Sequence, residues 1–273
     1  MTFVEGSILE ASVLREALVG VDSVFHLAAR VSVLESLRNP AQTHRVNVVG
    51  TRAVIEAARV AGVRAVVFTS SCALYGDSAE MPVSESSAPG PLSPYADSKL
   101  HAERIGYAQR EAGTGFAALR LFNVYGPGQD TGGGYAAVIA AFGRAAAGGV
   151  GPTIFGDGLQ TRDFVHVDDV VAALICAAEY VGAHGSAGPF NVGTGRAVTL
   201  LELWRAVARV TGSDASPAHR PRRPGEIVYS CADVTAIEQE LGWTATMGLF
   251  DGLRTTLCPR SPAGGDPGGV EAE

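Results

Sequence analysis

Apolar residues are grouped in two ways along the first half of the chain. Short continuous apolar runs are typical of strands buried on both faces of a sheet, and apolar residues that recur every three or four positions are typical of helices. Strands are predicted at 21–29, 64–71 and 116–122, and helices at 41–61 and 95–112. Because strands alternate with helices, the pattern predicts β-α-β units and a parallel sheet of the α/β class.

The second half has a more mixed pattern, in which loops rich in Gly and Pro at 126–134 and 148–158 separate helical segments. Helices are predicted at 135–147, 168–180, 199–211 and 233–241. The residues after Cys258 are mostly Gly, Pro and small polar residues, so 259–273 is predicted to be a disordered tail.

The composition fits a folded protein that works in water. Hydrophobic residues make up 47% of the 273 residues and charged residues 18%, which excludes disorder as the overall state. No apolar run approaches the ~18 residues of a membrane span, and the N-terminus lacks a basic leader, so a cytoplasmic protein is expected. The formal net charge of −7 argues against a general nucleic-acid binder, and an anionic ligand would need local arginines.

The four cysteines give no sign of a metal site. They are Cys72, Cys176, Cys231 and Cys258, which lie far apart, include no C-x-x-C pair and have no His-rich neighbourhood. Scattered thiols in a chain of this size indicate a reducing compartment.

Lys99 is the only lysine of the chain, and it follows Tyr95 by four residues. Ser93 and Pro94 are a typical N-cap and first helical residue, so Tyr95 and Lys99 are predicted on one face of a helix. An ammonium ~4 Å from a phenol, at an effective dielectric of ~20, would lower the phenol pKa from ~10 to ~7. Such a tyrosine could act as a general base. An ordinary cation–aromatic pair is the alternative interpretation of this spacing.

Polar or small residues follow each predicted strand of the first half. The strand at 64–71 ends in the hydroxyl cluster Thr69-Ser70-Ser71, the strand before it ends in His26-Leu-Ala-Ala29, and the third is followed by Asn123. Open α/β sheets bind their ligands at the carboxyl ends of parallel strands. The sequence therefore predicts a ligand site at this end of the sheet.

Together these motifs resemble the extended short-chain dehydrogenase/reductase family, in its UDP-glucose 4-epimerase-like nucleotide-sugar epimerase/dehydratase branch. The resemblance runs in order from residue 3 to about 257 and continues through four further motifs. These lie at 155–169, 191–195, 223–226 and 241–243.

The resemblance implies an NAD-binding, Rossmann-like doubly wound parallel sheet and a smaller C-terminal α/β substrate lobe. The first domain is expected over 1–123 and the second over 124–258, with 163–180 folding back onto the first. Homodimers are common in the family, so a homodimer is a further expectation.

The family's functional residues match single positions of this chain. The resemblance implies that Tyr95 is the base, that Lys99 contacts the nicotinamide ribose and Tyr95, and that Ser71 binds the sugar oxygen. Residues that would line the NAD are Leu27, Ala28, Ala29, Asn47 and Phe122, with Tyr95 and Lys99. Residues that would hold the sugar nucleotide and its pyrophosphate are Asn123, Arg162 and Arg223, with Ser71. A solvated basic patch is the alternative interpretation of the arginines at 220–223.

The reaction implied is the oxidation of the sugar 4-hydroxyl to a 4-keto intermediate and its reduction from the other face, with NAD regenerated in each cycle. Dehydratases of the family have Asp-Glu directly after the position of Ser71, because loss of water needs a carboxyl acid and base. Here these residues are Cys72 and Ala73, which favours an epimerase acting on a UDP- or dTDP-hexose over a dehydratase.

The chain departs from the family at its N-terminus. The family begins with a strand, a Gly-x-x-Gly-x-x-Gly turn and a helix that receives the NAD pyrophosphate, whereas this chain begins at what resembles the end of the third strand. The strand ending at His26 is therefore expected to be an apolar edge strand prone to aggregation. Two hypotheses follow: an epimerase whose sequence is given in shortened form, or a non-catalytic remnant that at most binds a sugar nucleotide.

Overall fold

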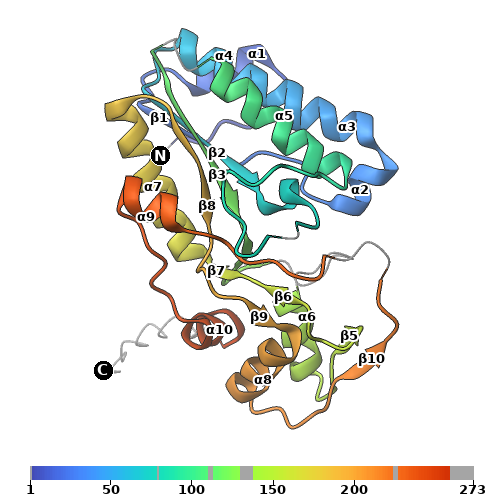
Figure 1. Ribbon diagram of the computed structural model, residues 1–273. Coiled ribbons are helices and arrows are strands. Elements are labelled where there is room, and N and C mark those ends of the chain that lie inside the picture. The colour runs from blue at the N-terminus through green and yellow to red at the C-terminus, as the bar shows by residue number, and fades with distance from the viewer. Residues whose placement is uncertain (1, 79, 110–112, 130–137, 224–226, 259–273) are drawn as a thin grey trace, which may run out of the picture.

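Three apolar runs of the N-terminal half pair side by side as parallel strands. In the computed structural model, which describes residues 2–78, 80–109, 113–129, 138–223 and 227–258, these strands are β1 (Ser23–His26), β2 (Ala65–Ser71) and β3 (Gly115–Leu121). A fourth strand, β8 (Ala187–Val192), adds beside β3, so the order is β1-β2-β3-β8 (Figure 1). The α/β class and the parallel sheet predicted from the sequence are confirmed.

Alternate residues of the central strands enter two different cores. Val66 and Phe68 of β2 pack on one face against the helices α4 (Thr51–Val60) and α5 (Pro94–Ala108). Their neighbours Ala65 and Val67 pack on the other face against α7 (Val167–His184) and α9 (Thr235–Leu241). The sheet is thus covered by helices on both sides, as an apolar strand without polar alternation requires.

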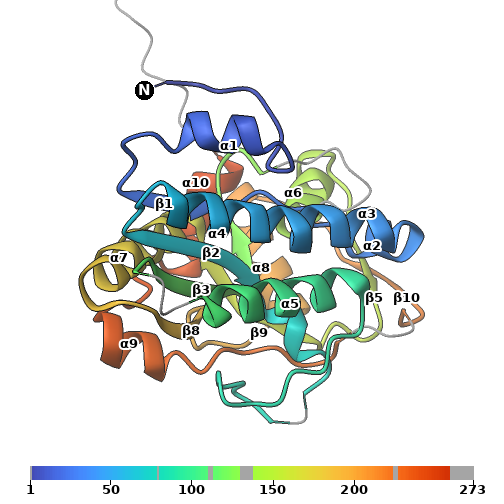
Figure 2. The same cartoon turned by 90° about the horizontal axis from the view of Figure 1, so that it is seen from above.

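The helix predicted at 41–61 is a composite rod. It comprises α3 (Pro40–His44), the π-helical segment η1 (Arg45–Gly50) and α4, and α5 runs alongside it (Figure 2). The expected cap of α5 is confirmed, since the Ser93 side chain accepts a hydrogen bond from the Ala96 backbone N–H at 3.2 Å. This cap fixes the start of the helix that carries Tyr95 and Lys99.

A second core lies below the main sheet and joins α6 (Val138–Ala147), α8 (Leu200–Thr211) and α10 (Leu249–Leu257) (Figure 1). Short two-stranded sheets complete this part: β4 (Asn123–Tyr125) with β7 (Phe164–His166), β5 (Thr153–Phe155) with β10 (Ala218–Arg220), and β6 (Thr161–Arg162) with β9 (Val198–Thr199). The remaining elements are α1 (Ala11–Ala17), α2 (Val33–Arg38) and the 3-10 turn η2 (Cys72–Tyr75).

The chain returns to the main sheet after entering this lower part. α7 packs against β2 and β3, and β8 follows it into the sheet, whereas the expected folding of 163–180 back onto a first domain stays a prediction. The division into domains at residue 123 stays a prediction. The helix ends expected at 110–112 and 135–137, and the tail expected at 259–273, lie outside the described residues.

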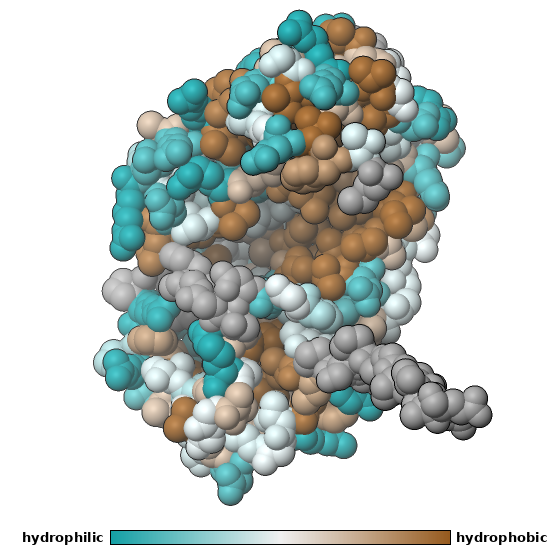
Figure 3. All heavy atoms as spheres, turned by 180° about the vertical axis from the view of Figure 1, so that it is seen from behind, coloured by the Kyte–Doolittle hydropathy of each residue, from teal (hydrophilic) through white to brown (hydrophobic). Residues whose placement is uncertain are grey.

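The strand that ends at His26 is an edge strand, as expected. In the described part of the chain β1 pairs only with β2. Apolar side chains of β1 and α7 are exposed, with Phe25 at 44% and Val171 and Ile175 at 48% and 47%. Apolar side chains also gather on the hollowed back of the molecule (Figure 3). Across the described residues, no helix has the length and apolar character that a membrane span requires.

Candidate active site

The three residues expected to be catalytic meet at the carboxyl end of β2. Ser71 is the last residue of β2, and Tyr95 lies in the first turn of α5. The Lys99 ammonium donates a hydrogen bond to the Thr69 carbonyl at 2.7 Å and lies 5.9 Å from the centre of the Tyr95 ring. The side chains of Ser71 and Tyr95 are joined by a hydrogen bond. The structure therefore brings a phenol, a hydroxyl and an amine together.

The pKa of Tyr95 is shifted in the direction opposite to the one expected from its spacing to Lys99. Burial raises this pKa above its ordinary value, and the hydrogen bond from Ser71 offsets only part of the rise. The expectation of a phenol pKa near ~7 is thus wrong for this arrangement. The physical reason is that the Lys99 ammonium is directed at the Thr69 carbonyl rather than at the phenol oxygen.

Lys99 itself is desolvated, with 3% of its surface exposed. Burial lowers its pKa to about 8, while the Glu103 carboxylate acts to raise it. His26, at the end of β1, has its pKa lowered to about 4 by burial and by the charge of Lys99. Its ring is therefore neutral near neutral pH, and its Nε2 atom lies 2.8 Å from the Thr51 hydroxyl.

The residues expected to line the cofactor lie around the same end of the sheet. Leu27 and Ala28 follow β1 and are exposed, and Ala29 is half-buried. Asn47, in η1, accepts a hydrogen bond from the Arg30 N–H at 2.7 Å and donates to the Arg30 carbonyl at 3.0 Å, so it holds the loop that follows β1. Phe122 is buried behind this edge.

These residues fit one end of a dinucleotide. Because Ala28 and Ala29 after β1 are small, a flat group could reach this edge of the sheet. Lys99 and Tyr95 offer hydrogen-bond donors beside it. Among the described residues, the buried atoms Nε of Arg30 and Oγ of Ser70 have no hydrogen-bond partner in the protein. They are free to bind a polar ligand at this edge.

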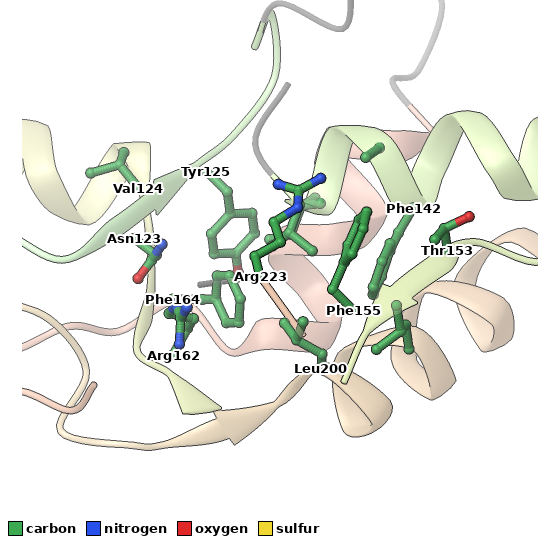
Figure 4. A pocket seen from close by; sticks show the side chains of 14 residues that line it. Asn123, Val124, Tyr125, Phe142, Thr153, Phe155, Arg162, Phe164, Leu200 and Arg223 are labelled. Carbon is green, nitrogen blue, oxygen red and sulfur yellow. The ribbon is translucent and has the colours of Figure 1, made fainter. Parts of the chain in front are cut away.

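A cavity of about 360 Å³ lies in the lower part of the molecule, beyond the end of β3. All three residues expected to hold the sugar nucleotide, Asn123, Arg162 and Arg223, line it (Figure 4). Apolar and aromatic side chains form the rest of its wall. They are Val124, Tyr125, Val138, Ile139, Ala141, Phe142, Ile154, Phe155, Phe164 and Leu200, with Thr153.

Phe155 is a site residue that the sequence reasoning missed. The guanidinium carbon of Arg223 lies 3.8 Å from the centre of its ring (Figure 4). The parallel pairing of β5 with β10, in which Arg220 is opposite Phe155, brings the arginine run to this aromatic residue. In the sequence, the position of Phe155 directly before Gly-Asp-Gly at 156–158 is the feature that could have indicated its place in the site. Together the two side chains offer a flat cationic platform for a heterocyclic base.

The catalytic cluster and the cavity are linked through neighbouring strand ends. Ser71 is opposite Leu121 in the β2–β3 ladder, and Asn123 follows two residues later. The charge of Arg162 also acts on Cys72, the residue after Ser71. A ligand seated against Asn123 and Arg162 would therefore lie next to Ser71.

No group of three or more His, Cys, Asp or Glu side chains within the described ranges is placed to hold a metal ion. The four cysteines are free thiols. The groups that the described site presents are the Ser71 hydroxyl, the Tyr95 phenol, the Lys99 amine and the guanidinium groups of Arg162 and Arg223.

The chain is similar in sequence and in fold to proteins of a known family. The model of the NAD-dependent epimerase/dehydratase family matches residues 1–193. UDP-glucose 4-epimerase of Mycolicibacterium smegmatis is 41% identical over 236 residues, which cover 86% of this chain and 74% of that protein.

Two solved structures have the same fold. UDP-glucose 4-epimerase of Thermotoga maritima, solved with UDP-glucose, is 36% identical, with a TM-score of 0.86 over 93% of this chain and 82% of that one. UDP-glucose-4-epimerase of Stenotrophomonas maltophila, solved with bound NAD and formylated UDP-arabinopyranose, is 31% identical, with a TM-score of 0.88 over 94% of this chain and 82% of that one.

Proposed function

The chain belongs to the NAD-dependent epimerase/dehydratase family, and from this membership we propose that it epimerises a nucleotide-diphosphate hexose at C4. NAD is the cofactor of the family. UDP- and dTDP-hexoses are the proposed substrates. The relatives named UDP-glucose 4-epimerase make the UDP-sugar the first choice to test.

One observation carries the proposal: the Ser71, Tyr95 and Lys99 side chains meet at the strand end next to a cavity lined by Arg162 and Arg223. Guanidinium forks suit the oxygens of a pyrophosphate, and the Arg223–Phe155 platform suits a nucleotide base. A nucleotide held in this way would direct its sugar toward Ser71 and Tyr95.

The roles proposed for the catalytic residues follow from their contacts. Ser71 accepts a hydrogen bond from the Ala73 N–H, which leaves its own proton available for the Tyr95 oxygen or the sugar hydroxyl. In its phenolate form, Tyr95 takes the proton of the 4-hydroxyl, and it returns this proton in the second half of the reaction. Lys99 stabilises the phenolate electrostatically. Residues around the end of β1, with Asn47 and Lys99, would hold NAD, which would supply a hydride acceptor for the oxidation of the sugar and a hydride donor for its reduction.

The same site argues against a dehydratase. Removal of water would need an acid and a base directly after Ser71. Burial raises the pKa of the Cys72 thiol to about 12, only partly offset by Arg162, so this thiol stays protonated near neutral pH. Ala73 has no ionisable group. The substitution of this pair therefore supports an epimerase.

A non-catalytic sugar-nucleotide binder is the second candidate function. It is supported by the cavity itself, because Asn123, Arg162 and Arg223 could hold a sugar nucleotide whether or not NAD binds. Both candidates use the cavity around Arg223. They differ in whether NAD binds, so native mass spectrometry of the chain with added NAD separates them.

The test of the epimerase is the Tyr95→Phe variant. We expect the loss of the hydroxyl to lower epimerisation of UDP-glucose by at least ~10³-fold, while UDP-glucose affinity by calorimetry stays within about threefold. Tyr229→Phe, which changes an exposed tyrosine, is the matched control and should keep full activity. Full turnover by Tyr95→Phe would refute the mechanism, whereas UDP-glucose binding without NAD binding or turnover by the unmodified chain would favour the binder.

We also propose a homodimer in the cytoplasm. The support for self-association is a groove between η1, α4 and α5, lined by the apolar Val48, Ile105 and Ala108 and by cationic side chains such as Arg52. The support for a reducing compartment is the four free thiols. Light scattering coupled to size exclusion would give the mass of the particle, and a monomer at all concentrations would refute the dimer.

A further inference from the structure

A buried ion pair lies one helical turn beyond Lys99. Glu103 follows Lys99 by four residues on α5, and Arg120 belongs to β3. The guanidinium donates two hydrogen bonds to the carboxylate, from Nε at 3.1 Å and from Nη2 at 2.8 Å. Both residues are buried, at 3% and 5% exposure. The pair thus joins the catalytic helix to the central sheet.

Arg120 extends this connection beyond the pair. Its Nη1 donates to the Tyr75 hydroxyl at 2.9 Å and to the Glu85 carbonyl at 3.2 Å. The Tyr75 hydroxyl in turn donates to Oδ1 of Asn191 at 2.6 Å. Tyr75 belongs to η2, the turn that begins directly after Ser71, and Asn191 belongs to β8. One guanidinium therefore ties together α5, β3, η2 and β8.

Stability alone does not account for this arrangement. Desolvation of two charges offsets most of their attraction, and replacement of a buried pair by apolar residues is often neutral or stabilising. The position of the pair offers a different reason. Glu103 lies one turn after Lys99 on α5, both residues are buried, and Arg120 fixes the Glu103 carboxylate through two hydrogen bonds, so its negative charge acts on the one lysine of the site.

We propose that Glu103 and Arg120 are a positioning pair for Lys99: the Glu103 carboxylate keeps the buried ammonium charged, and Arg120 holds that carboxylate in place. The inference rests on the proposed function, in which Lys99 must be cationic to stabilise the Tyr95 phenolate. Neither residue is expected to touch the substrate, so they act through Lys99.

The charged and titratable neighbours of Lys99 come from each element packed against it. His26 of β1 is neutral near neutral pH, because its pKa is lowered to about 4. Tyr95 on α5 is protonated, because burial raises its pKa. Burial also holds the pKa of Tyr75 and Cys72 of η2 at about 12. Glu103 is therefore the anion that offsets the burial of the ammonium.

The single lysine makes the test direct. Lysine labelled with ¹³C at the ε position gives one side-chain resonance, whose pH titration reports the Lys99 pKa without NAD, substrate or turnover. Glu103→Gln should lower this pKa by about one unit, because the carboxylate is lost and Arg120 is left uncompensated. Arg120→Met should raise it, because Glu103 keeps its charge and Lys99 becomes its remaining partner.

Opposite shifts distinguish positioning from a structural role. If the pair only held the helix in place, both substitutions would loosen the site and move the Lys99 pKa in the same direction, toward its value in water. Shifts of the same sign, or none, would overturn the proposal. Arg104→Met, which removes an exposed cation of the same helix, is the matched control and should leave the Lys99 pKa unchanged.

The double variant Glu103→Gln/Arg120→Met keeps the test decisive if a single variant fails to fold. It removes both buried charges together and should lower the Lys99 pKa, since the attraction of Glu103 is lost. An unchanged or raised pKa in the double variant would refute the proposal. Because the titration needs no catalysis, this outcome is independent of the result with Tyr95→Phe.

Discussion

Lys99 combines burial and charge in a way that makes its protonation sensitive to the fold. Its amine lies 4.7 Å from the centre of the Phe68 ring and donates to a backbone carbonyl, with little water around it. A folded-state pKa of about 8, against 10.5 for an unburied lysine, means that the folded chain binds this proton more weakly than the unfolded chain. The buried ammonium therefore lowers the free energy of unfolding at neutral pH. In the proposed mechanism the same charge stabilises the Tyr95 phenolate.

This cost predicts a pH dependence of stability. Lys99 lowers the free energy of unfolding below pH 8, and this penalty disappears as the pH rises from 8 toward 10.5. Relative to Lys99→Met, the wild-type chain should therefore gain up to about 3 kcal/mol over this range. Urea unfolding of both proteins at several pH values measures the difference. Parallel stability curves would show that Lys99 has an ordinary pKa in the folded chain.

At the scale of elements, helix α5 decides the geometry of the site. Its N-cap fixes the position of Tyr95, and its inner face packs against β2 and β3. Gly106 permits a close approach, because a Cβ atom there would lie 2.1 to 2.4 Å from three ring atoms of Phe116. Phe116 is itself packed edge-to-face against Tyr107 at 5.0 Å between ring centres. The absence of a side chain at 106 sets the distance between helix and sheet.

Gly106→Ala should therefore destabilise the protein despite the higher helix propensity of alanine. Overpacking of this kind costs about 1–3 kcal/mol, more than the ~1 kcal/mol that alanine gains in a helix. Gly182→Ala in α7 is the matched control, because its Cβ would meet only the Ala65 Cβ at 3.7 Å. Thermal melts should show a lower Tm for Gly106→Ala and an equal or higher Tm for Gly182→Ala. Equal effects of the two substitutions would contradict this account.

At the scale of the whole molecule, the centre of the sheet is covered on both faces, whereas its β1 edge is exposed. Helices cover both faces of β2 and β3, whereas β1 has a single strand partner in the part of the chain described here. Phe25 on β1 and Leu27 after it are 44% and 56% exposed. An exposed apolar edge strand favours pairing with other chains.

Phe25→Lys should reduce aggregation, because a charge on an edge strand opposes its addition to another sheet. Val19→Lys introduces the same charge at an exposed apolar residue outside the sheet and is the matched control. Light scattering on warming should show slower growth of large particles for Phe25→Lys than for Val19→Lys. If the two variants aggregate at the same rate, the edge of β1 is not the route of association.

Local patterns were sufficient for much of this protein. The apolar runs that predicted β1, β2 and β3 depend on the side-chain sequence alone, as does the Ser93-Pro94 start of the helix that carries Tyr95 and Lys99. The arginines expected at a phosphate, Arg162 and Arg223, line one cavity. These features are local or belong to a motif, so the residue types and their spacing determine them.

Tertiary structure decided the rest, because burial and charge depend on residues far apart in the sequence. The place of β8 beside β3 comes from packing on α7, since its segment, Ala187–Val192, contains Gly188 and Pro189 and has no strand-like run. The pKa of Tyr95 rises through desolvation, which no spacing reveals. The Glu103–Arg120 pair and the Arg223–Phe155 stack each join elements that only the fold brings together.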